Sequence, residues 1–165
     1  MTDRPNPLAT PIRGVNPVTI TLYGDNGQVD YALGRELERR GCRTHAVSVD
    51  MGWLRSAENV ICRLDTLAGQ RALEGLAGRD HPHATVVAVC ERPTDEYSYN
   101  RLRDMCEECG RKHDVSLIWH SSVDAPSVND RPPLEQLAES VVDEVSAMIG
   151  EADGTTFTDR YLDLS

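Results

Sequence analysis

The stretch that decides the fold is residues 18–41, which read VTITLYGDNGQVDYALGRELERRG. Residues 18–23 are a short β-branched and apolar run, which is typical of a buried strand. Gly24 and Gly27 interrupt this run. Apolar and polar residues then recur with helical spacing over 30–40, and the glycine that follows is typical of a helix end. The stretch therefore predicts a strand, a glycine turn and a helix in immediate succession.

The rest of the chain repeats this alternation. Further strands are predicted at 44–49, 84–90 and 115–120, and further helices at 67–76, 95–111 and 134–149. Residues 57–64 remain open between a loop and a short strand. Because parallel strands need helical crossovers, the alternation predicts an α/β fold, a three-layer α/β/α domain with a mainly parallel sheet. We place this single domain at residues 17–150, between a flexible N-terminal arm (1–16) and an irregular C-terminal tail (151–165).

Composition and charge exclude several classes of partner. A chain of 165 residues is long enough to bury a core in one domain. Its net charge of −10 repels phosphate backbones and anionic lipids, so we expect no nucleic acid and no membrane as partners. No run approaches the roughly 18 apolar residues of a membrane span, and the N-terminus has no signal-peptide pattern. The five cysteines lack a disulfide-scaffold spacing, which indicates free thiols and a cytoplasmic location.

The glycine turn resembles that of a known family. Gly24-x-x-Gly27 is similar to the G-x-x-G-x-x-G turn of extended or atypical short-chain dehydrogenases and NAD-dependent epimerases, with Asp30 at the third glycine position. The likeness extends loosely over residues 17–149 and implies a Rossmann-like fold. It also implies a dinucleotide site, because glycines there let backbone amides approach a pyrophosphate at the helix N-terminus. The residues that this resemblance assigns to cofactor binding are Gly24, Asn26, Gly27, Gln28 and Asp50.

Two acids in the same turn argue against that cofactor. Asp25 and Asp30 would lie near a bound pyrophosphate and repel it, although an acid in the first turn suits the helix dipole. Asp50 ends the second predicted strand, where the family has an acid for the ribose hydroxyls, but it comes two residues later than usual. Two alternatives stay open: a domain that binds NAD(P), and one that binds no cofactor.

The family's proton-relay pair is missing. In that family a tyrosine passes a proton to the substrate, and a lysine four residues later lowers the pKa of the tyrosine. The only lysine here, Lys112, has no tyrosine four residues before it, and Leu134 and Ala138 occupy the positions expected for the pair. The resemblance is therefore to a truncated member that lacks the catalytic Tyr-x-x-x-Lys.

The candidate site residues follow the predicted strands, because ligands of open parallel sheets bind outside the carboxyl ends of the strands. His120 could act as a general base, with a hydroxyl at Ser122 and a carboxylate at Asp124. Neighbours along a strand point to opposite faces, which argues against a triad built from them. The residues that we assign to catalysis are His120, Ser122, Glu91 and Tyr97. Those that we assign to substrate binding are Cys90, Arg92, Tyr99, Asn100 and Asp124.

The pair Cys106-x-x-Cys109 has the spacing of half a metal site. A zinc site needs four ligands, and only His113 follows nearby at helical spacing. Two thiols three residues apart on a helix share a face, so we expect core or dimer packing and no metal. We expect a homodimer through the helices at 95–111 and 134–149.

These features favour an enzyme of bacterial small-molecule metabolism, including biosynthesis, that works on a small-molecule ligand without hydride transfer. Its reaction would be that of a lyase, isomerase, cyclase or hydrolase. Two alternatives remain. One is a non-catalytic module that binds a nucleotide, another ligand or a protein partner on the same scaffold. The other is an NAD(P)-dependent oxidoreductase with an unusual site.

Overall fold

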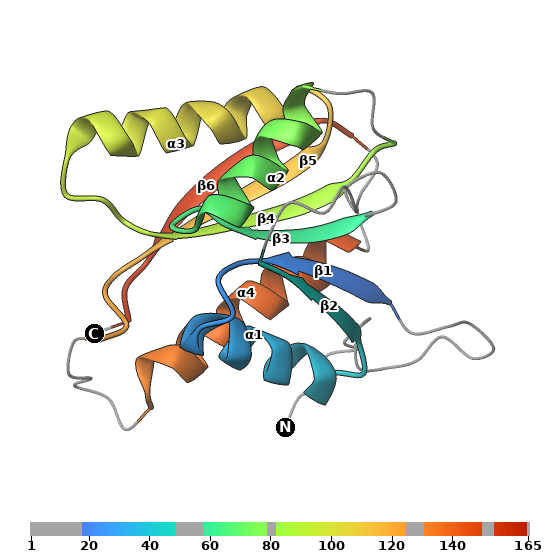
Figure 1. Ribbon diagram of the computed structural model, residues 1–165, viewed down its shortest axis with the longest axis vertical. Helices are drawn as coiled ribbons and strands as arrows, with labels where there is room; N and C mark the ends of the chain where they lie inside the picture. Colours follow the sequence, from blue (N-terminus) through green and yellow to red (C-terminus); the bar gives the residue numbers. More distant parts are fainter. Residues whose placement is uncertain (1–17, 49–57, 79–81, 125–130, 150–153, 165) are drawn as a thin grey trace.

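The predicted alternation folds into one parallel sheet in the computed structural model, which describes residues 18–48, 58–78, 82–124, 131–149 and 154–164. Within these residues the sheet has six strands in the order β2-β1-β3-β4-β5-β6, and every neighbouring pair is parallel (Figure 1). The strands are β1 (Thr19–Tyr23), β2 (Arg43–Val47), β3 (Asn59–Arg63), β4 (Thr85–Glu91), β5 (Asp114–His120) and β6 (Thr156–Leu162).

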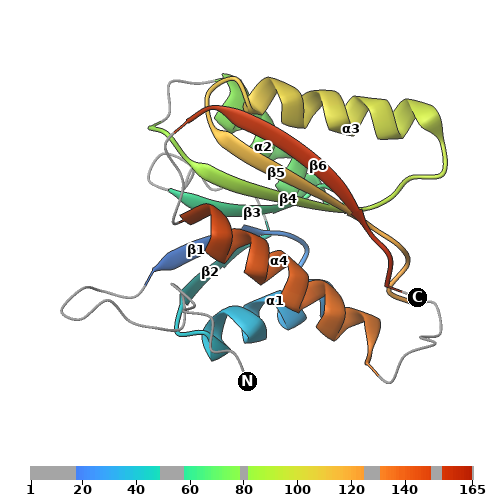
Figure 2. The same ribbon diagram turned by 180° about the vertical axis from the view of Figure 1, so that it is seen from behind.

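Helices cover both faces of this sheet. α1 (Gln28–Arg39) and α4 (Pro133–Ile149) lie side by side on one face, and α2 (Leu67–Gly78) and α3 (Glu96–Cys109) lie on the other (Figures 1 and 2). This arrangement confirms the predicted three-layer, Rossmann-like α/β/α fold. Among the described residues, no helix has the length and apolar character needed to cross a membrane.

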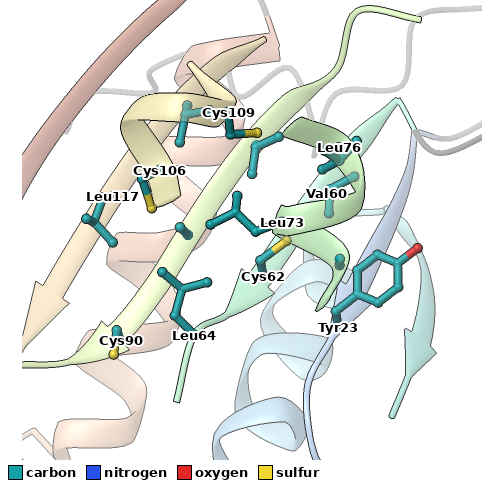
Figure 3. Close-up of a cluster of buried hydrophobic side chains, with 14 of the residues drawn as sticks. Tyr23, Val60, Cys62, Leu64, Leu73, Leu76, Cys90, Cys106, Cys109 and Leu117 are labelled. Carbon is teal, nitrogen blue, oxygen red and sulfur yellow. The ribbon is translucent and has the colours of Figure 1, made fainter. Parts of the chain in front are cut away.

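The pleat of the sheet divides the core into two clusters. Along β5, Trp119 packs with α2 and α3, whereas Ile118 packs with α1 and α4. Figure 3 shows the first cluster, in which Cys106 and Cys109 of α3 pack among leucine and valine side chains. Because successive side chains of a strand alternate, His120 at the end of β5 falls on the α1/α4 face with Ile118.

The end of β3 is packed tightly against the start of α2. A Cβ on Gly69 would lie 1.9 Å from the carbonyl oxygen of Arg63, so no larger residue fits there. The hydroxyl of Thr66 donates to the same carbonyl at 2.6 Å and accepts from the Gly69 amide at 3.1 Å. This turn fixes the backbone of Arg63 at the carboxyl edge of the sheet.

β3 is the strand that the sequence left open at residues 57–64. It pairs with β1 and β4 in the middle of the sheet. The strand order reverses here, because β2 lies on one side of β1 and β3 lies on the other. The usual dinucleotide-binding order places the third strand beyond the second, whereas β1 to β5 follow the other common doubly wound order, 2-1-3-4-5.

The expectation of an irregular tail after residue 151 is wrong. Residues 156–162 form β6, which pairs with β5 in parallel. The carboxylate of Asp114 holds the start of this strand, since it accepts from the Thr156 hydroxyl at 2.8 Å and from the Gly154 amide at 3.2 Å. β6 is the outermost strand and its side chains are exposed or half-buried, so it lacks the apolar run of a buried strand. The predicted arm at 1–16 lies outside the described residues.

Candidate functional site

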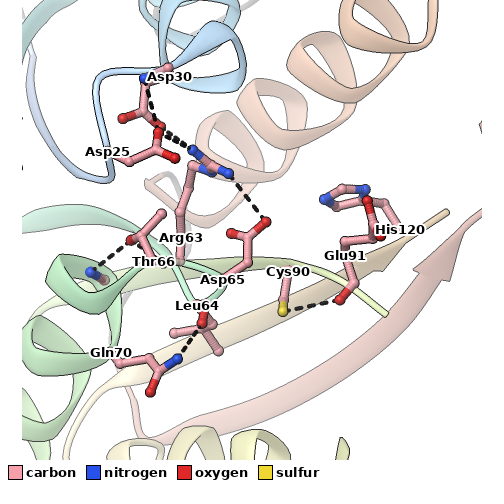
Figure 4. Close-up of polar contacts among 12 residues, drawn as sticks. Asp25, Asp30, Arg63, Leu64, Asp65, Thr66, Gln70, Cys90, Glu91 and His120 are labelled. Atoms are coloured by element: carbon pink, nitrogen blue, oxygen red, sulfur yellow. Dashed lines mark hydrogen bonds and ion pairs between the residues drawn. The ribbon is translucent and has the colours of Figure 1, made fainter. Parts of the chain in front are cut away.

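The candidate site lies at the carboxyl edge of the sheet, where the strand order reverses between β1 and β3. β1 leads into α1 on one face and β3 leads into α2 on the other, which is the topology at which open parallel sheets bind ligands. Polar side chains from the β1–α1 turn and from the ends of β3, β4 and β5 gather there (Figure 4). They are Asp25, Asp30, Arg63, Asp65, Glu91 and His120.

The strand register brings three of these residues to one face. Glu91 and His120 are direct neighbours across β4 and β5. Arg63 pairs with Val89, which lies two residues before Glu91 and therefore on the same side of the sheet. The end of β3 and the ends of β4 and β5 thus present their polar side chains to the α1/α4 face.

The glycine turn between β1 and α1 is filled by carboxylates of its own. The amide of Asn26, a residue with φ of 60°, donates to Asp30 Oδ2 at 2.8 Å. The amide of Gly27 donates to Asp25 Oδ1 at 2.9 Å. A Cβ on Gly24 would lie 2.1 Å from Asp30 Oδ2, so the glycine makes room for this carboxylate.

Arg63, at the end of β3, offsets part of the negative charge of these carboxylates. Its Nη1 donates to Asp25 Oδ1 and to Asp30 Oδ1, each at 2.8 Å, and its Nη2 donates to Asp65 Oδ2 at 3.2 Å. Arg63 and Asp30 are each only 6% exposed. Burial opposes the ionisation of Asp25, but the Gly27 amide and the Arg63 guanidinium outweigh it and lower the pKa of this carboxyl.

The turn does not fit the diphosphate of a dinucleotide. The amides of Asn26 and Gly27 already donate to carboxylates, and the Asp30 side chain occupies the space over Gly24. A diphosphate placed there would meet Asp25 and Asp30 at contact distance. Gln28 of the predicted cofactor set is the first residue of α1, and Asp50 lies outside the described residues.

His120 is held as a neutral base. It is 2% exposed, and its Nδ1 lies 2.7 Å from the carbonyl oxygen of Ser121. A carbonyl only accepts, so Nδ1 carries a proton, and in the neutral ring Nε2 then keeps its lone pair. Burial lowers the pKa of His120, although Asp65 and Glu91 work in the opposite direction. Its imidazole points toward Asp65 and Arg63 (Figure 4).

Ser122 and Asp124 do not form a triad with His120. The hydroxyl of Ser122 accepts from the Asp124 amide at 3.1 Å and closes a local turn. The neighbouring hydroxyl of Ser121 accepts from the Leu164 amide at 2.8 Å, which ties this turn to the end of β6. The backbone carbonyl of Ser121, rather than a carboxylate, orients the imidazole.

Glu91 and Cys90 point to opposite faces at the end of β4. Glu91 is exposed beside His120, whereas Cys90 is buried in the α2/α3 cluster. The thiol of Cys90 lies 3.2 Å from the carbonyl oxygen of Glu91. Burial raises the pKa of Cys90 to about 12, so this thiol stays protonated and is a poor nucleophile.

Arg92 and Tyr99 belong to an aromatic group on the α2/α3 face. The Arg92 guanidinium lies 5.2 Å from the ring centre of Tyr99 and 5.4 Å from that of Tyr161. Tyr99 stacks on Trp119 at 4.6 Å. Tyr97 and Asn100, near the start of α3, are exposed. The structure therefore separates Arg92, Tyr97, Tyr99 and Asn100 from the face of His120.

Cys106 and Cys109 are core residues. Both are fully buried in the α2/α3 cluster, and burial raises the pKa of each thiol, that of Cys109 to about 12. Among the described residues, no group of three or more potential ligands has the arrangement of a metal site. His113 is held elsewhere, between Ala84 and Leu76. The core-packing alternative for this pair is confirmed.

A cavity of about 690 Å³ lies between α1 and α4, but the polar site is not part of it. Its lining includes Gln28, Tyr31 and Arg35 of α1 together with Leu134 of α4. His120 and Glu91 do not line it. We place the site at the strand ends because the titratable groups converge there.

Arg63 and Asp65 are the site residues that the sequence analysis missed. The run VIC at 60–62, followed by a charged residue, resembles the other strand ends and was the available signal. The partners of Arg63 in the glycine turn lie 33 and 38 residues away, so no local pattern indicates them.

Comparison with protein-family models gives no match, and neither do comparisons with curated proteins and with solved structures.

Proposed function

We propose that this chain is an enzyme that moves a proton on a polar small molecule, with His120 as the general base and without hydride transfer. The observation that carries the proposal is the state of His120, a buried neutral imidazole with Nδ1 bonded to the Ser121 carbonyl. A base of this kind can take a proton from a carbon or hydroxyl of the substrate at Nε2. Such chemistry belongs to a lyase, isomerase, cyclase or hydrolase.

Glu91 is the second group of the proposed mechanism. It is the cross-strand neighbour of His120 and is exposed, so its carboxylate can reach a ligand bound over the strand ends. In this mechanism His120 returns the proton that it has taken to another atom of the substrate, and the Glu91 carboxylate accepts a hydrogen bond from a polar group of the substrate. Arg63 does not bind substrate, since its guanidinium is engaged by three carboxylates.

The proposed relationship to short-chain dehydrogenases and epimerases rests on the strand, glycine turn and helix at residues 18–41 and on the parallel sheet. Two features support a reaction without hydride transfer. The expected tyrosine and lysine positions hold Leu134 and Ala138, and the carboxylate of Asp30 fills the glycine turn.

A non-catalytic ligand-binding or partner-binding module is the second candidate. The observation that favours it is the ion-pair network of Arg63, in which the guanidinium and three carboxylates at this edge of the sheet contact one another. In that case the site would keep its scaffold and bind a ligand without turnover.

The cellular setting is also part of the proposal. We propose a cytoplasmic homodimer. The cytoplasmic location is supported by the cysteines, because all five lie within the described residues and are buried and unpaired. Light scattering coupled to gel filtration tests the dimer. A mass near twice 18.3 kDa is expected, and a mass equal to one chain contradicts the dimer.

The function is tested by screening and then by mutation. A thermal-shift screen of hydroxy acids, keto acids, sugars and nucleosides identifies binders, because a ligand of the native state raises Tm. Mass spectrometry then follows conversion of each binder. We expect His120→Ala to lower turnover by about 10²–10⁴-fold while binding persists.

His45→Ala, on the edge strand β2, is the matched control and should leave turnover unchanged. Unchanged turnover in His120→Ala would remove this residue from the mechanism. Binding without conversion of any compound by the wild type would favour the non-catalytic module instead.

A further inference from the structure

We propose that the glycine turn is an anion cradle whose occupant is the carboxylate of Asp30, so that phosphate groups are excluded until that side chain is removed. This inference concerns the turn between β1 and α1 and does not depend on the activity proposed for His120.

The hydrogen bonds of the turn are those of an anion site. Backbone amides at a helix N-terminus bind phosphate because their N–H groups are unpaired and the helix dipole favours negative charge. Here the amide of Asn26 donates to Asp30 at 2.8 Å, and the amide of Gly27 donates to Asp25 at 2.9 Å. Carboxylate oxygens of the chain therefore take two of the backbone donors that a phosphate bound at this turn would use.

The space over the first glycine is filled by the same side chain. A Cβ on Gly24 would lie 2.1 and 2.3 Å from the two oxygens of Asp30. Glycine at this position normally lets a ligand approach the backbone closely. In this chain it admits the Asp30 carboxylate, which is 6% exposed and directed back over the turn (Figure 4).

The positive charge that faces the carboxylates also comes from the chain itself. Arg63 contacts Asp25, Asp30 and Asp65, so one guanidinium faces three carboxylates. This group has one positive charge against three negative ones, and a phosphate beside the buried Arg63 and Asp30 would add to that excess. The network also joins the β1–α1 turn to the end of β3 across the point of strand-order reversal.

Three variants separate the effects of space and charge. Asp30→Asn keeps the volume of the side chain and removes its charge. Asp30→Gly restores the third glycine of the motif and empties the space. Asp25→Asn combined with Asp30→Gly leaves Arg63 facing Asp65 alone. Each protein is titrated with inorganic phosphate and pyrophosphate, with Tm and the amide resonances of residues 24–27 as readouts.

We expect no response from the wild type or from Asp30→Asn. Asp30→Gly should respond weakly, and the double variant should gain about 3–5 °C in Tm once phosphate is about tenfold above its dissociation constant. Adding Arg63→Met to the double variant should abolish the gain, because the cation that completes the cradle is then lost.

Two results would overturn the proposal. One is phosphate or pyrophosphate binding to the wild type that shifts the amides of Asn26 and Gly27. The other is a folded double variant that shows no phosphate response. If the glycine variants do not fold, the wild-type titration still decides, since the proposal requires those two amides to stay unaffected.

Discussion

Two buried histidines flank β5, and they are held in opposite ways. His113, just before the strand, uses both ring nitrogens: Nδ1 accepts from the Ala84 amide at 3.0 Å, and Nε2 donates to the Leu76 carbonyl at 3.0 Å. His120, at the other end, bonds to the Ser121 carbonyl through Nδ1. The two rings are therefore opposite tautomers. The difference indicates a structural role for His113 and is consistent with the role that we propose for His120.

Removing His113 should have the largest effect on stability. His113→Ala leaves a buried amide and a buried carbonyl without their partner and opens a cavity, because the side chain is 0% exposed. We expect a loss of about 3–4 kcal/mol in the free energy of unfolding, measured by urea denaturation. His45→Ala on β2 serves as the control. A loss below about 1 kcal/mol would show that the contrast between the two histidines is wrong.

Removing His120 should cost less stability. His120→Ala also opens a cavity, because the side chain is 2% exposed, but it gives up one hydrogen bond rather than two, so we expect a loss of about 2–3 kcal/mol in the same urea experiment. The fall in turnover described above should be far larger than this loss explains. A stability loss equal to that of His113→Ala would make His120 a structural residue of the same kind.

His120 should make the free energy of unfolding depend on pH. Burial lowers its pKa in the folded protein below the ordinary 6.5. As the pH falls, the unfolded chain therefore binds a proton at this histidine before the folded protein does. The contribution of His120 to the free energy of unfolding is thus fully present above pH 6.5 and is lost as the pH falls below it. Asp25, whose folded pKa lies below 3.8, loses its contribution only at more acid pH. His120→Gln should flatten the stability curve just below pH 6.5. An unchanged slope in this variant would assign that region to another group.

The smallest effect is expected at Ser122. Its hydroxyl accepts a hydrogen bond from the Asp124 amide in a surface turn, and a backbone carbonyl rather than this hydroxyl bonds to the imidazole of His120. Ser122→Ala should change the free energy of unfolding by no more than about 0.5 kcal/mol and should leave turnover intact. A loss of turnover comparable to that of His120→Ala would show that the Ser122 hydroxyl takes part in the mechanism.

Local patterns predicted the layers of the fold but not all of its edges. The run at 18–23, the glycine turn and the helical spacing after it gave β1 and α1, because buried strands and amphipathic helices have distinct periods. β6 was missed because an edge strand has no apolar run of its own. Its place depends on contacts between Asp114 and residues about 40 positions later.

The candidate site likewise has features that the sequence predicts and features that depend on contacts distant in the sequence. The repulsion that Asp25 and Asp30 would exert on a diphosphate follows from the sequence of the turn alone. The guanidinium that holds both carboxylates comes from Arg63, which only the pairing of β3 beside β1 brings near. The state of His120 likewise depends on its burial and on a backbone carbonyl, neither of which a motif specifies.

The most direct test is to observe the imidazole nitrogens by long-range ¹H–¹⁵N NMR at pH 7. His120 should be neutral with the proton on Nδ1, and His113 should carry its proton on Nε2, with assignments made from the signals that disappear in His120→Gln and His113→Ala. A titration should place the pKa of His120 below 6.5. An imidazolium at pH 7, or a proton on Nε2 of His120, would contradict its assignment as the base.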